Sequence, residues 1–178
     1  NALQRALAEL DIAPHTVQVV SGIGCSSNLP GFINAYGFHG LHGRSLPVAT
    51  GAKLGNHDLT VIVTGGDGDG YGIGVGHFVH TCRRNVDMTY IVMDNQIYGL
   101  TTGQASPTTE KDIRTKSTPE GTIELALSPI ALALTCGATY VARGFSGEIL
   151  QLAQLMKGAI EHKGFAVVDV FSPCVTYN

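Results

Sequence analysis

The chain has 178 residues, of which 44% are hydrophobic, and this suits one globular domain, residues 1–178, with a substantial core. A formal net charge of −3 without any basic run argues against nucleic acid as a partner. No apolar stretch approaches the roughly 20 residues that span a bilayer, and no signal peptide is visible, so we expect a cytoplasmic protein without a membrane partner.

Hydrophobic periodicity predicts helices and strands in alternation along the chain. Asn1–Leu10 carries leucines at helical spacing and should form a helix with Asn1 at its cap. The further elements that we expect are strand Thr16–Val20, helix Leu46–Leu54, strand Thr60–Thr64, helix Tyr71–Arg84, strand Asp87–Met93, helix Glu124–Cys136, strand Tyr140–Ala142, helix Ser146–His162 and strand Phe165–Val170. This order predicts an α/β fold with a mostly parallel sheet and helices on both faces.

Two local features accompany these elements. Ser146 should cap the last helix, with Glu148 in the first turn, because a hydroxyl and a carboxylate both suit the exposed N–H groups there. Residues 101–118 are polar, irregular and rich in threonine, which is typical of a surface loop that carries function. We therefore expect this segment to be an active-site loop.

The central stretch, residues 60–103, joins a strand, a glycine-rich turn, a helix and a second strand. The first strand should break at Gly65, and a right-handed crossover would place the two strands side by side and parallel. Asp67 and Asn95 would then follow the carboxyl ends of strands roughly 4.8 Å apart. Their oxygens suit Mg²⁺, and the glycines and the helix N-terminus near Gly70 would admit a diphosphate. The residues alone therefore predict a Mg²⁺-diphosphate site.

Two other phosphate-binding motifs, GxGxxG and GxxxxGK[ST], do not occur in the sequence. Gly66-Asp67-Gly68, followed by 26 residues and then Asn95, resembles the thiamine diphosphate signature. A bare GDG is also found in ordinary glycine-rich turns. This signature on its own therefore leaves both interpretations open.

Four further stretches make the resemblance more specific. They are SGIGCSSNLPGF (Ser21 to Phe32), YGFHGLHGRSLPVATGAKLGN (Tyr36 to Asn56), IYGLTTGQASPTT (Ile97 to Thr109) and FSPCVTYN (Phe171 to Asn178). In this order and at this spacing, the chain resembles the β subunit of 2-oxoacid:ferredoxin oxidoreductases over nearly its whole length. The segment ALSPIALALTCGATYVARGF looks closest to the 2-oxoglutarate-type members. The resemblance implies a thiamine diphosphate-binding fold.

The resemblance also implies roles for individual residues. Asp67 and Asn95 would ligate Mg²⁺ through their side chains, and Ile97 through its carbonyl. The cofactor would be lined by Ile23, Gly24, Cys25, Ser26, His42, Gly68, Asp69, Gly99 and Leu100. His42 would face the phosphates, and Asp69 has a second interpretation as the N-cap of the helix that follows.

The four cysteines fall into two groups. Cys82 and Cys136 lie in predicted helices and should pack as small hydrophobic residues. Cys25 and Cys174 each follow a predicted strand, and the resemblance implies that both ligate a 4Fe-4S cluster. The other two ligands of that family come from a CPGC-type stretch near the N-terminus, which is absent from this sequence. We therefore expect the chain to be a fragment that cannot complete the cluster alone.

The family's chemistry is the oxidative decarboxylation of a 2-oxoacid, with thiamine diphosphate as electron sink, ferredoxin as electron acceptor and coenzyme A as acyl acceptor. Thiamine enzymes use a glutamate to activate the cofactor, and none of the six glutamates here lies at a predicted strand end. The resemblance implies that the partner α subunit supplies it. We therefore expect an obligate complex with an α subunit.

Three alternatives remain open at this point. One is a subunit of a non-oxidative thiamine diphosphate-dependent decarboxylase or synthase, which would need no cluster cysteines. Another is a Rossmann-type nucleotide-binding module, which the missing GxGxxG disfavours. The third is a non-catalytic interaction subunit. The pair His39 and His42 in FHGLHGR also has the spacing of zinc ligands, but no third ligand is nearby in the sequence.

Overall fold

The computed structural model describes residues 1–177, so Asn178, the last residue of the FSPCVTYN stretch, lies outside the described residues. Within these residues, six parallel strands form one sheet in the order β2-β1-β3-β4-β8-β7. The strands are β1 (Val17–Ser21), β2 (Tyr36–His39), β3 (Thr60–Gly66), β4 (Met88–Asp94), β7 (Tyr140–Phe145) and β8 (Phe165–Phe171). The predicted α/β fold with a mostly parallel sheet is confirmed.

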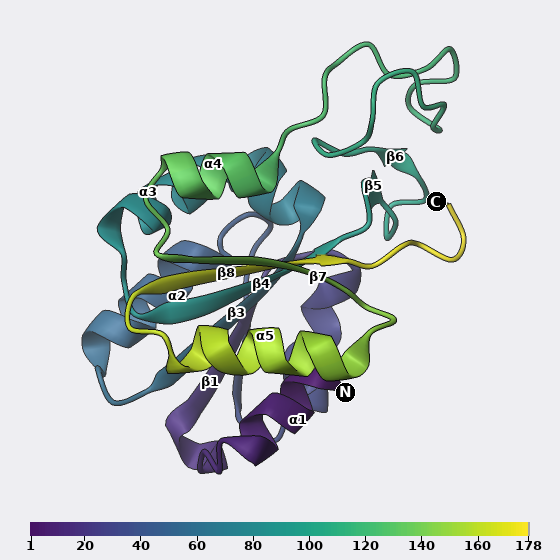
Figure 1. Cartoon of the computed structure of the whole chain (residues 1–178). Helices are drawn as coiled ribbons and strands as arrows, with labels where there is room; N and C mark the ends of the chain where they lie inside the picture. The colour runs from purple at the N-terminus through teal and green to yellow at the C-terminus, as the bar shows by residue number, and fades with distance from the viewer. Residues whose placement is uncertain (178) are drawn as a thin grey trace.

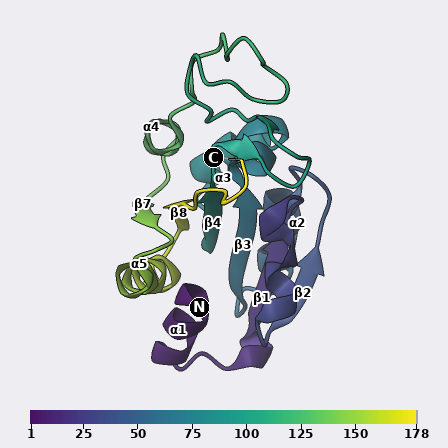
Figure 2. The same ribbon diagram turned by 90° about the vertical axis from the view of Figure 1, so that its right-hand side faces the viewer.

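Helices cover both faces of the sheet, as Figures 1 and 2 show. The helices are α1 (Ala2–Glu9), α2 (Ser45–Gly55), α3 (Val75–Arg84), α4 (Pro129–Thr135) and α5 (Ile149–Glu161). One core cluster joins α1 and α5 to one face, and a second joins α2, α3 and α4 to the other. None of the helices within residues 1–177 is long and apolar enough to cross a bilayer.

Strand β3 shows why these sequences become central strands. Val61 and Val63 enter the cluster under α2 and α3, whereas Ile62 enters the cluster on the opposite face. All three side chains are at most 2% exposed. A parallel strand buried on both faces has a nearly continuous apolar run, here rich in β-branched residues, rather than an alternating pattern. β4 and β8 follow the same rule, although Asp94 ends β4 and Asp169 interrupts β8.

The sheet topology determines where a ligand can bind. All six strands run in the same direction, so their carboxyl ends meet at one edge. β1 and β3 are neighbours, and the chain continues from β1 to β2 on one side but from β3 to β4 on the other side. The space above such a topological switch point is the usual ligand site of an open α/β sheet. Gly22 and Asp67 follow the ends of β1 and β3 at this point.

Two predicted boundaries around the central turn are wrong. β3 does not break at Gly65, because Gly65 and Gly66 stay extended and pair with Val92 and Met93 of β4. The next residues, Gly68–Ile73, form one wide π-helical turn, and α3 begins only at Val75 rather than at Tyr71. Glycines tolerate either backbone geometry, so sequence pattern did not distinguish an extended pair from a turn.

Other corrections concern the C-terminal half and short elements. Helix α4 begins at Pro129 rather than Glu124, because proline lacks an N–H group and suits the first helical position, while it disfavours a helix before it. Ser146 does not cap α5, since Glu148 occupies the cap position. Three short elements were not predicted from the sequence. They are edge strand β2, the 3₁₀ segment Cys25–Phe32, and the hairpin of β5 (Ile97–Tyr98) with β6 (Gln104–Ala105).

Asn85 ends α3 in the left-handed conformation, with φ of 51°. Its Oδ1 accepts hydrogen bonds from the backbone N–H of Phe165 and the hydroxyl of Thr139, both at 2.7 Å. This single side chain therefore joins the turn before β4 to the start of β8.

We expect Asn85→Gly to lower the free energy of unfolding by about 1 kcal/mol, because it removes both bonds and keeps the backbone relaxed. Asn85→Ala should lower it by about 2 kcal/mol, because alanine adds the penalty of the left-handed conformation. Urea denaturation of the 178-residue chain checks both values. Equal losses in the two variants would show that the backbone conformation contributes nothing.

Candidate cofactor site

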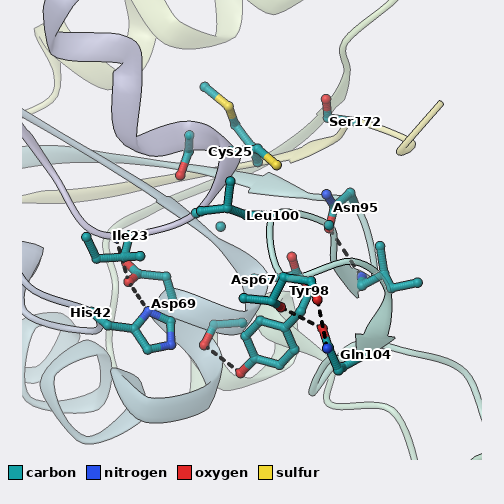
Figure 3. Close-up of a pocket in the computed structure, with 18 of the residues that line it drawn as sticks. Ile23, Cys25, His42, Asp67, Asp69, Asn95, Tyr98, Leu100, Gln104 and Ser172 are labelled. Carbon is teal, nitrogen blue, oxygen red and sulfur yellow. Dashed lines mark hydrogen bonds and ion pairs between the residues drawn. The ribbon is translucent and has the colours of Figure 1, made fainter. Parts of the chain in front are cut away.

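A cavity of about 710 Å³ opens at the carboxyl edge of the sheet, over β1, β3 and β4. Every residue predicted to line the cofactor or to ligate Mg²⁺ contributes to its wall; Cys174, predicted only as a cluster ligand, does not. The wall also contains residues that the sequence analysis did not single out: Gly66, Met93, Tyr98, Thr101, Gln104, Ala105, Ser117 and Ser172. Figure 3 shows how side chains from these loops face one another around the cavity.

Asp67 and Asn95 lie where the sequence predicted them. β3 and β4 are neighbouring parallel strands, and the last residue of β3 pairs with Met93, two residues before Asn95. The Asp67 side chain is 2% exposed, and its Oδ2 accepts a hydrogen bond of 2.7 Å from the Thr108 hydroxyl. Asn95 Oδ1 accepts from the backbone N–H of Ile97 at 3.2 Å. The two oxygen-bearing side chains therefore share one end of the cavity.

Asp69 holds three loops together through one oxygen. Its Oδ1 accepts hydrogen bonds from the backbone N–H groups of Ile23 at 3.0 Å and Gly43 at 2.7 Å, and contacts Nδ1 of His42 at 2.8 Å (Figure 3). The other oxygen, Oδ2, has no hydrogen-bond partner within residues 1–177. It lies against Gly22, where a Cβ would overlap it.

The interpretation of Asp69 as a helix N-cap is wrong. Asp69 lies inside the π-helical turn, and Gly74 occupies the cap position of α3. Its carboxylate oxygen bonds to the loops after β1 and β2 instead of to the first turn of α3. A carboxylate only accepts hydrogen bonds, so it organises the surrounding N–H donors.

Tyr98 packs against the turn that carries these carboxylates. Its hydroxyl donates to the carbonyl of Gly68 at 3.1 Å, and its ring lies so close to Gly68 that a Cβ there would overlap it. The ring of His42 meets the Tyr98 ring edge-on, with centroids 6.3 Å apart. Burial, together with the charges of Asp67 and Asp69, raises the pKa of Tyr98, so the phenol remains a neutral donor.

The cavity floor is acidic. Burial raises the pKa of Asp67, although hydrogen bonds from Ser106 and Thr108 partly offset this effect. Burial, followed by the charges of Asp67 and Asp169, raises the pKa of Asp94 to about 6. The hydroxyl of Thr108 lies 3.0 Å from Asp94 Oδ1 as well as 2.7 Å from Asp67. Two carboxylates thus share one hydroxyl at the ends of neighbouring strands.

A further buried carboxylate, Asp169 in β8, holds the central turn through Tyr71. It accepts a hydrogen bond of 3.0 Å from the Tyr71 hydroxyl and one of 2.8 Å from Nε of Arg143. Burial raises the pKa of Asp169, and the Arg143 guanidinium opposes that shift. The guanidinium also lies 4.4 Å from the centre of the Phe171 ring. Tyr71 therefore ties the turn to β8 across the sheet.

The sulfurs of Cys25 and Cys174 converge as the sequence analysis expected. A Cβ on Gly99 would lie 3.5 Å from Cys25 Sγ and 3.6 Å from Cys174 Sγ, so both sulfurs face the same small region at the cavity. The C-terminal segment reaches this place by folding back against Gly103, where the Tyr177 ring packs. Among residues 1–177, no group of three or more histidine, cysteine, aspartate or glutamate side chains is arranged to hold a metal ion.

The two remaining cysteines lie away from the cavity. Cys82 is fully buried in the cluster under α3, and Cys136 is half-buried against the same cluster. Burial and the neighbouring Cys136 raise the pKa of the Cys82 thiol to about 12. Both therefore pack as small hydrophobic residues, as predicted, although Cys136 is less enclosed than Cys82.

Of the two histidines in FHGLHGR, one lies outside the cavity wall and the other lines it. His39 lies beside its own loop, with Nδ1 3.0 Å from the Ser21 hydroxyl and 3.3 Å from the carbonyl of Ser27. His42 alone of the pair lines the cavity. No glutamate is among the residues of its described wall. The missed residues Tyr98 and Thr108 lie in the IYGLTTGQASPTT stretch, which the sequence analysis treated as a motif rather than residue by residue.

Comparisons with known proteins agree with this geometry. Residues 12–170 match the family described as thiamine pyrophosphate enzyme, C-terminal TPP binding domain. The chain is 54% identical, over 100% of its length, to the 2-oxoacid:ferredoxin oxidoreductase subunit beta of Saccharolobus solfataricus, of which it covers 59%. It is 45% identical, over 99% of its length, to the 2-oxoglutarate synthase subunit KorB of Methanocaldococcus jannaschii, of which it covers 66%.

A solved structure gives the same result in three dimensions. The 2-oxoglutarate:ferredoxin oxidoreductase of Magnetococcus marinus, with 2-oxoglutarate, coenzyme A and succinyl-CoA bound, superposes with a TM-score of 0.98 and 51% identity. The match covers 99% of this chain and 61% of that chain. The chain therefore spans little more than half of the relatives it matches most extensively. The chain therefore belongs to the thiamine pyrophosphate enzymes, and among them it is closely similar in sequence and fold to β subunits of 2-oxoacid:ferredoxin oxidoreductases such as these.

Proposed function

We propose that this chain, as one domain of residues 1–178, binds the diphosphate end of thiamine diphosphate and its Mg²⁺ ion within a β subunit. The complete enzyme would convert a 2-oxoacid, with 2-oxoglutarate favoured, to acyl-CoA and CO₂ and pass electrons through a 4Fe-4S cluster to ferredoxin. The observation that carries this proposal is the position of Asp67 and Asn95, which follow the ends of the neighbouring strands β3 and β4 and both line one cavity, in a chain of this family.

The residues present fit the proposed cofactor. A volume of about 710 Å³ lies within the range of roughly 300–1,000 Å³ that small-molecule sites occupy. Asp67, Asn95 and the carbonyl of Ile97 would supply oxygen ligands to Mg²⁺, with water and phosphate oxygens completing the shell. Burial raises the pKa values of Asp67 and Asp94, and a divalent cation beside them would stabilise their charged forms in place of the lost water.

Asp69 would act by positioning the loops rather than by touching the phosphates. A carboxylate facing a diphosphate would repel it, and Asp69 Oδ1 instead faces Ile23, His42 and Gly43. With Nδ1 held by Asp69, the other ring nitrogen of His42, Nε2, would be left for the cofactor. Gly24, Ser26, Gly68, Gly99 and Leu100 would complete the lining.

When bound, thiamine diphosphate would supply the nucleophile for the 2-oxo group and take up the electron pair that stays on the substrate carbon when CO₂ leaves. The chain's own part is to hold the cofactor, exclude water and provide two thiolates, Cys25 and Cys174, at the cavity. The other cluster ligands and the activating glutamate would come from elsewhere in the complex, the glutamate from an α subunit.

A non-oxidative thiamine diphosphate-dependent decarboxylase or synthase is the alternative that needs separating from this proposal. Such an enzyme has no use for two sulfurs that face one point beside the cofactor cavity. The convergence of Cys25 and Cys174 therefore favours the oxidative reaction, and iron content distinguishes the two.

Asp67→Ala removes the only anionic protein ligand that we assign to Mg²⁺. We expect thiamine diphosphate to bind the whole complex at least tenfold more weakly in the presence of Mg²⁺, which corresponds to about 1.4 kcal/mol. Titration calorimetry measures the affinity. Asp58→Ala serves as the matched control, because Asp58 is an exposed carboxylate just before the start of β3, at the opposite edge of the sheet. An unchanged affinity in Asp67→Ala would remove Asp67 from the site.

Asp94 should make the cofactor-free chain less stable as pH rises. Its folded pKa of about 6 lies above the ordinary value of 3.8, so the folded chain holds this proton more tightly than the unfolded chain. The free energy of unfolding should therefore fall between about pH 4 and pH 6 by up to about 3 kcal/mol. Denaturation at each pH checks this, and Asp94→Asn should remove that part of the slope. A slope that survives in Asp94→Asn belongs to other groups.

The proposed reaction is tested on the complete enzyme with a panel of 2-oxoacids, coenzyme A and ferredoxin. We expect the highest rate of ferredoxin reduction with 2-oxoglutarate. Cys25→Ser and Cys174→Ser should each lose bound iron and ferredoxin reduction, because each removes a cluster thiolate. Cys136→Ser is the control and should keep both. An enzyme that releases CO₂ without iron and without reducing ferredoxin would support the non-oxidative alternative instead.

A further inference from the structure

The loop between β6 and α4 is anchored to the acidic end of the cavity by Thr108. This side chain is 2% exposed although it belongs to a long connection that extends away from the sheet (Figure 1). Its hydroxyl lies 2.7 Å from Asp67 Oδ2, 3.0 Å from Asp94 Oδ1 and 3.2 Å from Oγ of Ser106. A surface loop thus places one polar atom between the carboxylates that end β3 and β4.

The neighbouring residues strengthen this attachment. The Thr109 hydroxyl donates to the carbonyl of Gln96 and accepts from the N–H of Ser106. The carbonyl of Pro107 accepts from the N–H of Leu127, which closes the base of the loop. Residues 106–109 therefore form the fixed end of the connection, which we call the anchor.

The part of the loop beyond the anchor has little support. Residues 110–126 carry Ile113, Ile123 and Leu125 at exposures of 47%, 88% and 84%. Backbone bonds of this part join Asp112 and Ile113 to Thr122 within the loop itself, and the N–H of Lys116 donates to the carbonyl of Gly103 in the turn between β5 and β6. A segment with few buried apolar contacts has a low free energy of local opening, so its order depends on the anchor and on this bond to the turn.

The Thr108 hydroxyl has a single hydrogen and two carboxylates within reach, so it donates to one of them at a time. Without a cation, the buried carboxylates of Asp67 and Asp94 compete for that hydrogen and repel each other. A cation bound by Asp67 would neutralise one carboxylate and end the competition, which would strengthen the anchor. The geometry therefore makes the anchor sensitive to occupation of the metal site.

We propose that Thr108 is a positioning residue that orients Asp67 for Mg²⁺ and couples occupation of the cofactor site to the order of residues 110–126. This inference rests on the proposed function, because it takes Asp67 as a Mg²⁺ ligand. It adds a residue, and a coupling between the site and the loop, that the assignment of ligands does not contain. The loop would be held most firmly when the site is full.

Three variants in the whole complex separate the hydroxyl from its surroundings. Thr108→Val keeps the shape and removes the hydroxyl, and Thr108→Ser keeps the hydroxyl and removes the methyl group. Thr115→Val is the control within the same loop, because the Thr115 hydroxyl bonds to Ser117 and Thr118 rather than to the carboxylates. Calorimetry gives the affinity for thiamine diphosphate with Mg²⁺, and hydrogen exchange gives the protection of residues 110–126 with and without both.

We expect the cofactor with Mg²⁺ to slow exchange of residues 110–126 in the unmodified complex. Thr108→Val should bind about tenfold more weakly, exchange faster in this segment even without cofactor, and lose the response to cofactor. Thr108→Ser and Thr115→Val should behave like the unmodified complex. Unchanged affinity and an intact response in Thr108→Val would overturn the inference, as would equal losses in Thr108→Val and Thr108→Ser.

One further outcome concerns the proposed function instead. An unmodified complex that does not bind thiamine diphosphate with Mg²⁺ would overturn that function and the coupling with it. The exchange of residues 110–126 without cofactor would still report whether Thr108 anchors the loop. The two failures are therefore distinguishable in the same set of measurements.

Discussion

The cavity depends on a single buried oxygen atom, Oδ1 of Asp69. A carboxylate that is 2% exposed loses most of its hydration and stays charged only where donors replace the water. Here the donors come from Ile23, His42 and Gly43, which belong to the loops after β1 and β2. Three segments distant in sequence therefore cannot shift independently, and the part of the cavity wall that they form is fixed before any ligand arrives.

Much of the fold could be predicted because buried parallel strands leave a simple pattern. The β-branched runs of β1, β3, β4 and β8 are legible in sequence, and their order along the chain implies crossovers of one hand. Strand β2 was missed because Tyr36–His39 is an exposed edge strand in which pairing with β1, rather than burial, fixes the backbone. The π-helical turn Gly68–Ile73 was missed because glycines fit several geometries equally well.

The residues of the candidate site also differ in how far the sequence predicts them. Asp67 and Asn95 could be found because topology alone brings the ends of neighbouring parallel strands together. Three other contacts could not be predicted in this way. They are the bonds of Thr108 to Asp67 and Asp94, the bond of Asp169 to Tyr71, and the contact of Tyr98 with the turn at Gly68. Each depends on a long-range contact between loops, and no local periodicity records which side chain a distant loop will meet. The family resemblance marked the stretch Ile97 to Thr109 as a motif, whereas the structure shows which side chains of that stretch bond to which residues of the site.

The bond between Tyr71 and Asp169 also determines how this molecule comes apart. It connects the turn that carries Gly68 and Asp69 to the interior of β8, where both side chains are at most 2% exposed. A turn secured in this way belongs to the same cooperative unit as the centre of the sheet, whereas residues 110–126 open alone at much lower free energy. Brief native-state fluctuations would therefore expose the outer loop to proteases many times before they disturb the floor of the cavity.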